Sequence, residues 1–172
     1  MFFGANAEGL AAKMDSFDKI LQDLRPPVFT LQEVKMKPIR GKDRAIKTAH
    51  SIDYVIFQLI RKGGKEGEGL ATGALKDLKP ILIREGDNDI EILSIEINVS
   101  GFKIRVINGY SSQLSDTKDK KNNYWALMDR EVTEAEELGH GLVIQIDGNL
   151  HAGPKVVKDD PVSQCRNGKI FL

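Results

Sequence analysis

The apolar residues of two long segments recur every three or four positions, the spacing that places them on one face of a helix. The first segment spans residues 10–24 and ends before Pro26, because proline disfavours a helical conformation in the residue that precedes it. The second spans residues 116–138 and is followed by Gly139, a residue type that commonly closes helices. The apolar stripe of the second helix consists of Trp125, Met128, Val132 and Ala135. We expect its acidic residues, including Glu131, to face solvent.

Shorter apolar runs predict the β-strands. They span 28–31, 51–60, 70–75, 80–84, 90–97, 102–107 and 142–146. Most of these runs follow one another with only a turn between them, so hairpins should dominate and the strands should pair mostly antiparallel. The last run comes after the second helix, and we expect it to be a buried strand. The order of elements predicts an α+β fold rather than a doubly wound parallel sheet.

Length, charge and cysteine content narrow the class of protein. A chain of 172 residues is long enough to bury a two-layer core, and we treat 1–172 as one domain. Its 25 basic residues balance its 25 acidic ones, so any contact with nucleic acid must come from a local basic patch. The single cysteine, Cys165, excludes an internal disulfide and agrees with an intracellular location. No apolar run approaches the ~20 residues that cross a bilayer, so no membrane contact is expected.

One segment concentrates positive charge. Residues 35–47 lack a periodic apolar face and contain one acid, Asp43, which predicts an exposed loop. The basic residues that it offers to a nucleic acid are Lys35, Lys37, Arg40, Lys42 and Arg44. Contacts between such side chains and phosphates would make binding depend on salt. An ordinary solvated surface loop is the alternative interpretation.

Polar residues follow several of the apolar runs closely. They are Asn6, Glu33, Tyr110, Asp147 and Asn149. Strand ends of one layered structure can converge on one rim, where side chains combine a rigid base with access to solvent. The oxygen and amide groups of this set suit a hard cation such as Mg²⁺ and do not suit zinc. Each cluster taken alone is also compatible with a solvated strand end or a turn.

Taken in order, these clusters resemble the exonuclease–endonuclease–phosphatase superfamily. Asn6 opens a stretch similar to its Asn-x-x-Gly-Leu element, and Leu31-Gln32-Glu33 looks like its Leu-Gln-Glu metal motif. Asn108-Gly109-Tyr110 resembles its Asn-x-Tyr element, and Asp147-Gly148-Asn149 is similar to its Gly-Asp-Phe-Asn motif. The nearest likeness is to the endonuclease domain of non-long-terminal-repeat retrotransposons. The resemblance implies an α/β/β/α sandwich with mostly antiparallel sheets.

The resemblance also implies a role for each residue. Glu33 would bind the divalent metal, Mg²⁺ or alternatively Mn²⁺, with Asn6 beside it. Tyr110 would orient the scissile phosphate. Asp147 would position or deprotonate the attacking water, and Asn149 would hold Asp147 and the phosphate oxygens. A cation and aimed donors stabilise the negative charge that develops when a phosphodiester is cleaved.

The sequence departs from the family pattern in two places. Ile146 and Gly148 replace the usual Gly and Phe beside Asp147. The family's C-terminal Ser-Asp-His motif does not occur in this sequence, and none of His50, His140 and His151 stands in such a context. We therefore expect a domain that is incomplete at its C-terminus, with its last strands missing, and weak or undetectable nicking by the chain alone.

Three functions follow from this reading. The first is a Mg²⁺-dependent phosphodiesterase, an endonuclease that nicks DNA as part of a retroelement polyprotein. Its partners would be DNA, a downstream reverse transcriptase and a second copy in a homodimer, and its location would be nuclear. The second is a phosphatase of the same superfamily that acts on a small phosphorylated substrate. The third is a non-catalytic chain that binds nucleic acid or another protein.

Overall fold

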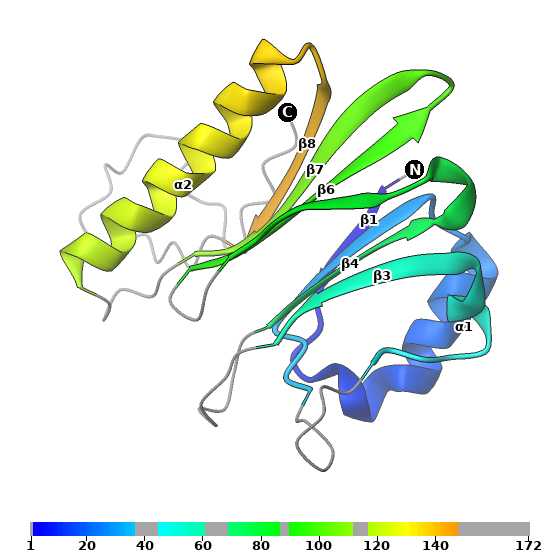
Figure 1. The fold of residues 1–172 in the computed structure, drawn as a ribbon. Helices are drawn as coiled ribbons and strands as arrows, with labels where there is room; N and C mark the ends of the chain where they lie inside the picture. The colour runs from blue at the N-terminus through cyan, green and yellow to red at the C-terminus, as the bar shows by residue number, and fades with distance from the viewer. Residues whose placement is uncertain (1, 37–44, 61–68, 87–89, 112–116, 148–172) are drawn as a thin grey trace, which may run out of the picture.

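The fold is seen in a computed structural model that describes residues 2–36, 45–60, 69–86, 90–111 and 117–147. Two four-stranded sheets pack face to face, with one long helix on the outer side of each (Figure 1). The predicted α+β sandwich is therefore confirmed. None of the described helices is long and apolar enough to cross a membrane.

The first sheet has the strand order β1-β2-β4-β3. Its strands are β1 (Phe2–Asn6), β2 (Val28–Gln32), β3 (Tyr54–Leu59) and β4 (Leu70–Leu75). β1 runs parallel to β2, and the other two pairs are antiparallel. The strand expected over 51–60 begins only at Tyr54, because a single 3-10 turn, η2 (His50–Asp53), takes up its first residues. The hydroxyl of Ser51 is hydrogen-bonded to the backbone of Thr48, which favours this turn over an extended conformation.

The second sheet has the strand order β5-β6-β7-β8. Its strands are β5 (Ile81–Glu85), β6 (Glu91–Val99), β7 (Phe102–Tyr110) and β8 (Gly141–Asp147), and a 3-10 turn, η3 (Lys76–Leu78), precedes it. Only the β7–β8 pair is parallel. Pairing in both sheets is therefore mostly antiparallel, as predicted. β8 is half-buried rather than buried, because it lies at an edge of this sheet in the described part of the chain.

Apolar side chains fill the space between the sheets. Val28 and Ala74 of the first sheet pack against Ile95, Ile97 and Val106 of the second, and all five are at most 1% exposed. Alternate residues of β2 point the other way, toward α1 (Met14–Leu24) and the 3-10 turn before it, η1 (Leu10–Lys13). The helix predicted over 10–24 therefore begins with a tighter turn.

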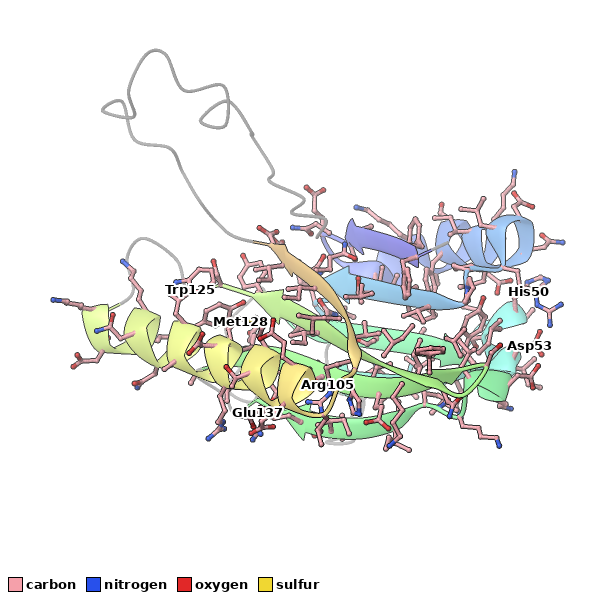
Figure 2. The ribbon with its side chains drawn as sticks, turned by 90° about the horizontal axis from the view of Figure 1, so that it is seen from above. His50, Asp53, Arg105, Trp125, Met128 and Glu137 are labelled. Carbon is pink, nitrogen blue, oxygen red and sulfur yellow. The ribbon has the colours of Figure 1, made fainter. Side chains whose placement is uncertain are left out.

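Helix α2 (Lys118–Glu137) presents a different face to the sheet from the one predicted. The buried residues are Tyr124, Met128, Glu131 and Ala135, whereas Trp125 is 47% exposed and Val132 is half-buried. Expecting Glu131 to face solvent was wrong, because Arg105 of β7 donates a hydrogen bond to it at 3.1 Å and Arg84 of β5 forms a second ion pair. Figure 2 shows Arg105 beside the C-terminal end of α2.

Candidate active site

Four of the predicted site residues stand at the same end of the sandwich. Asn6 and Asp147 are the last residues of β1 and β8, Tyr110 is the last of β7, and Glu33 follows β2 directly. Because β1 pairs with β2 and β8 with β7 in parallel, each pair of strands delivers its polar residues to one edge. Figure 1 shows β1 and β8 running to this shared end of the two sheets.

The side chain of Asn6 joins the two carboxylates. Its Nδ2 donates one hydrogen bond to Oε1 of Glu33 at 2.9 Å and another to Oδ2 of Asp147 at 2.8 Å. Its Oδ1 accepts from the backbone N–H of Glu8 at 3.0 Å, which fixes which way the amide faces. The fixed amide therefore holds the Glu33 carboxylate of the first sheet close to the Asp147 carboxylate of the second.

Glu33 receives three side-chain donors. Besides Asn6, Tyr110 donates its hydroxyl to Oε1 at 3.4 Å, and the ammonium of Lys35 lies 2.7 Å from Oε2. Partial burial of Glu33 by itself raises its pKa, but the hydrogen bonds from Lys35, Asn6 and Tyr110 outweigh burial and lower the pKa below its ordinary value. Glu33 is therefore an ionised carboxylate at neutral pH.

The backbone after β2 sets the direction of the Glu33 side chain. Glu33 and Lys35 have φ angles of 50° and 48°, in the left-handed region that non-glycine residues seldom adopt. Val34 between them is buried, and its N–H donates to the carbonyl of Gly69 at 3.0 Å. These contacts stabilise an otherwise unfavourable conformation, and strain of this kind concentrates at functional sites.

A buried pair of polar residues, Gln32 and Asn108, lies deeper between the sheets than Glu33 and Tyr110. Asn108 is fully buried, its Oδ1 accepts from Gln32 at 2.7 Å, and its Nδ2 donates to the carbonyls of Leu31 and Ala71 at 3.2 and 3.0 Å. It therefore ties β7 to β2 and β4. Asn108 was expected only as part of the Asn-x-Tyr element, with no role of its own. The polar residue types at 32 and 108 within apolar runs were the available signal.

A further acid occupies the same row of the second sheet. Glu91 is opposite Tyr110, which is opposite Asp147, so the three residues stand side by side across β6, β7 and β8. Glu91 is 5% exposed and accepts from the N–H of Gly69 at 3.2 Å. Glu91 was not among the predicted site residues, because the strand pairing that aligns it with Tyr110 cannot be predicted from its own segment.

Of the remaining predicted site residues, Lys35 lies within the described part of the chain and five do not. Asn149, Lys37, Arg40, Lys42 and Arg44 all fall outside the described residues. The side chain of Lys35 is partly exposed, and its ammonium is paired with Glu33. The pairing favours the Glu33 carboxylate and raises the pKa of Lys35.

The donor set fits a magnesium-like cation bound through few protein ligands. Among the described residues, no group of three or more His, Cys, Asp or Glu side chains is arranged to hold a metal by itself. Mg²⁺ does not need such a cage, because it keeps several waters and commonly takes one or two carboxylates together with substrate phosphates. Glu33 supplies a carboxylate of that kind, and Asn6 holds the Asp147 carboxylate beside it.

Comparison with known proteins places the fold. No protein-family model matches the chain, and no curated protein matches it. Solved structures do match: humanized TDP2 from D. rerio with a TM-score of 0.60 at 16% identity, and the 3'-5' exonuclease NExo from Neisseria meningitidis with 0.59 at 24%. The catalytic domain of human Nocturnin matches with a TM-score of 0.59 at 10% identity.

These matches cover most of this chain and less of the others. They include 86%, 87% and 87% of the chain, but only 65%, 57% and 63% of TDP2, NExo and Nocturnin respectively. The chain therefore spans less than two thirds of each of these structures. The shared fold agrees with the sandwich that the sequence resemblance implied.

Proposed function

We propose that this chain carries the metal-binding and water-handling side of a phosphodiesterase site that cleaves DNA. The observation that carries the proposal is the bridge from Asn6 to Glu33 and Asp147, which gathers carboxylates from two sheets at one accessible end. Two matching structures support DNA as substrate by their descriptions: TDP2 from D. rerio complexed with single-strand DNA product, and NExo, named as a 3' phosphatase, bound to a product DNA hairpin.

Each residue has a task that its surroundings favour. Glu33 is the ligand for Mg²⁺ or Mn²⁺, and the bound cation would neutralise phosphate charge as the leaving oxygen departs. Asn6 holds the Glu33 and Asp147 carboxylates in place, because its amide donates a hydrogen bond to one oxygen of each. Asp147 accepts the proton of the attacking water. Tyr110, already hydrogen-bonded at the rim, orients the phosphate, and Asn149 supports Asp147.

The retroelement endonuclease is the specific form of this function that we propose. It implies a downstream reverse transcriptase, a nuclear location, and DNA contacts from the basic loop at Lys35, Lys37, Arg40, Lys42 and Arg44. We also propose a homodimer, which rests on the sheet edges and not on the retroelement assignment. Within the described residues β1 and β8 are sheet edges, and unpaired edges favour association with another chain. Sedimentation velocity over a range of protein concentrations tests the homodimer.

A plasmid nicking assay tests the proposed function. Supercoiled plasmid is incubated with the chain and Mg²⁺, with the chain and EDTA, and with a Glu33→Ala variant. Nicking by the chain is expected to be weak at most, and the proposal requires that any nicking depends on Mg²⁺ and is lost in Glu33→Ala. Nicking that persists in EDTA, or equally in the variant, would contradict it.

A phosphatase is the second candidate, because one matching structure is described as a 3' phosphatase. Release of inorganic phosphate from a 3'-phosphorylated oligonucleotide, without nicking of plasmid, would favour it. Release from a small phosphorylated metabolite but not from the oligonucleotide would favour a small-molecule phosphatase. Binding of DNA without either reaction would favour a non-catalytic chain.

A further inference from the structure

The ammonium of Lys35 lies against the oxygen of the Glu33 carboxylate that Asn6 and Tyr110 do not contact. Oε1 of Glu33 is taken by Asn6 and Tyr110, whereas Oε2 receives Lys35 at 2.7 Å. Among the described residues, Lys35 is the one cationic side chain that contacts Glu33. A divalent ion bound through Oε2 would therefore approach the oxygen on which the ammonium now lies.

The fold directs Lys35 to this position. Glu33 and Lys35 both have left-handed φ angles and flank the buried Val34, and the ammonium of Lys35 lies 2.7 Å from Oε2 of Glu33. The carbonyl of Val34 accepts from the N–H of Leu10 at 2.9 Å, which anchors the turn to the segment after β1. The side chain of Lys35 is still 38% exposed, so its ammonium can leave for solvent without disturbing the core.

We propose that Lys35 is a built-in counter-cation of Glu33 that competes with the divalent ion and so sets the metal affinity of the site. This inference rests on the proposed function. Without an ion, Lys35 offsets part of the repulsion between Glu33 and Asp147, which Asn6 holds close together. When an ion binds, the ammonium must give up Oε2. Removing its charge leaves two carboxylates without that cation, which favours binding of a divalent ion.

Mn²⁺ titration followed by electron paramagnetic resonance tests this inference without measuring activity, because bound Mn²⁺ loses the signal of the free ion. The variant is Lys35→Met, which keeps the length of the side chain and removes its charge. We expect its Mn²⁺ dissociation constant to fall about five- to tenfold relative to the wild type. Damage to the site would weaken binding, so a gain in affinity separates competition from a structural role.

Two further variants serve as controls. Lys13→Met removes a charge near the same rim, where Lys13 contacts the carbonyl of Ala7 at 2.9 Å and Glu8 at 3.6 Å, and should change the affinity by less than about twofold. Lys35→Arg keeps the charge and should bind Mn²⁺ about as tightly as the wild type.

The outcomes separate this inference from the proposed function. Wild-type binding that is lost in Glu33→Ala, together with unchanged or weaker binding in Lys35→Met, overturns the role of Lys35 and leaves the metal site standing. A wild-type chain that binds no Mn²⁺, or a Glu33→Ala variant that binds it equally well, overturns the metal site and the inference with it.

Discussion

The hydroxyl oxygen of Tyr124 lies 2.5 Å from the point that a Cβ atom on Gly109 would occupy. Helix α2 therefore packs against bare backbone at the residue between Asn108 and Tyr110. Burial raises the pKa of Tyr124, and its hydroxyl has no hydrogen-bond partner among the described residues. A glycine at 109 is what allows the ring to approach this closely.

Gly109→Ala should destabilise the protein, because the new methyl group must push a rigid, buried ring away from the sheet. Overpacking of this kind typically costs about 1–3 kcal/mol of unfolding free energy. Urea denaturation measures the change. Tyr124→Phe in the Gly109→Ala background should recover part of the loss, since it removes the oxygen that meets the methyl group. An unchanged denaturation midpoint for Gly109→Ala would contradict this account of the packing.

Tyr124→Phe alone should be close to neutral or slightly stabilising. A buried hydroxyl without a partner keeps its desolvation cost, and replacing it with hydrogen removes that cost. The midpoint of urea denaturation should stay the same or rise. A marked loss of stability would show that the hydroxyl has a bonding partner that this packing does not include.

Glu131→Gln should destabilise the protein strongly. The side chain of Arg105 is 3% exposed and that of Glu131 is fully buried, so the substitution leaves a buried guanidinium without its counter-charge. Breaking a buried pair from one side typically costs about 3–5 kcal/mol. Glu134→Gln is the matched control one turn along α2. Its side chain is 39% exposed, so the loss should stay below about 1 kcal/mol. Similar losses for both variants would argue against a buried ion pair.

The stability contributed by Glu33 should depend on pH with a defined sign. Its pKa is lower in the folded chain than the ordinary 4.5, so the folded state binds its proton less readily than the unfolded state. Its contribution is fully present above about pH 4.5 and is lost as the pH falls through the folded-state pKa. The difference in unfolding free energy between wild type and Glu33→Gln should therefore shrink on acidification. A difference that stays constant from pH 7 to pH 3 would contradict the lowered pKa.

Glu33→Ala and Asp147→Asn should separate metal binding from turnover. Glu33→Ala removes the proposed ligand, so both Mn²⁺ affinity and nicking should fall. Asp147→Asn removes only the proposed base, so Mn²⁺ binding should largely persist while the rate falls on the order of 10²–10⁴. Parallel Mn²⁺ titration and plasmid nicking measure the two effects. Full activity in Asp147→Asn would require another group to handle the water.

Seven of the eight described strands could be predicted from their apolar runs, and β1 (Phe2–Asn6) was missed. Burial was harder to predict: in β5, Ile81 and Leu82 remain 50% and 42% exposed. The face that α2 buries against the sheet could not be predicted in the same way. Tyr124 and Glu131 are buried on that face. A polar residue type predicts exposure, and the sequence does not indicate that a partner from a distant strand, such as Arg105, pairs with Glu131 in the interior. The proximity of Asn6, Glu33, Tyr110 and Asp147 could be predicted, because strand ends of one layered structure can converge. The contact of Lys35 with Glu33 escaped that reasoning, because it depends on positive φ angles that neither residue type predicts.

The hydrogen bond from Asn6 to Asp147 joins residues that are 141 positions apart in the sequence. Contacts of such long range form late, because the loop between them must close first. During synthesis the first sheet can pair long before β8 has emerged. The nascent chain would then hold Glu33 and Asn6 without the second carboxylate. Formation of the Asn6–Asp147 hydrogen bond should therefore report that both sheets have docked, at a stage when the first sheet already holds Glu33.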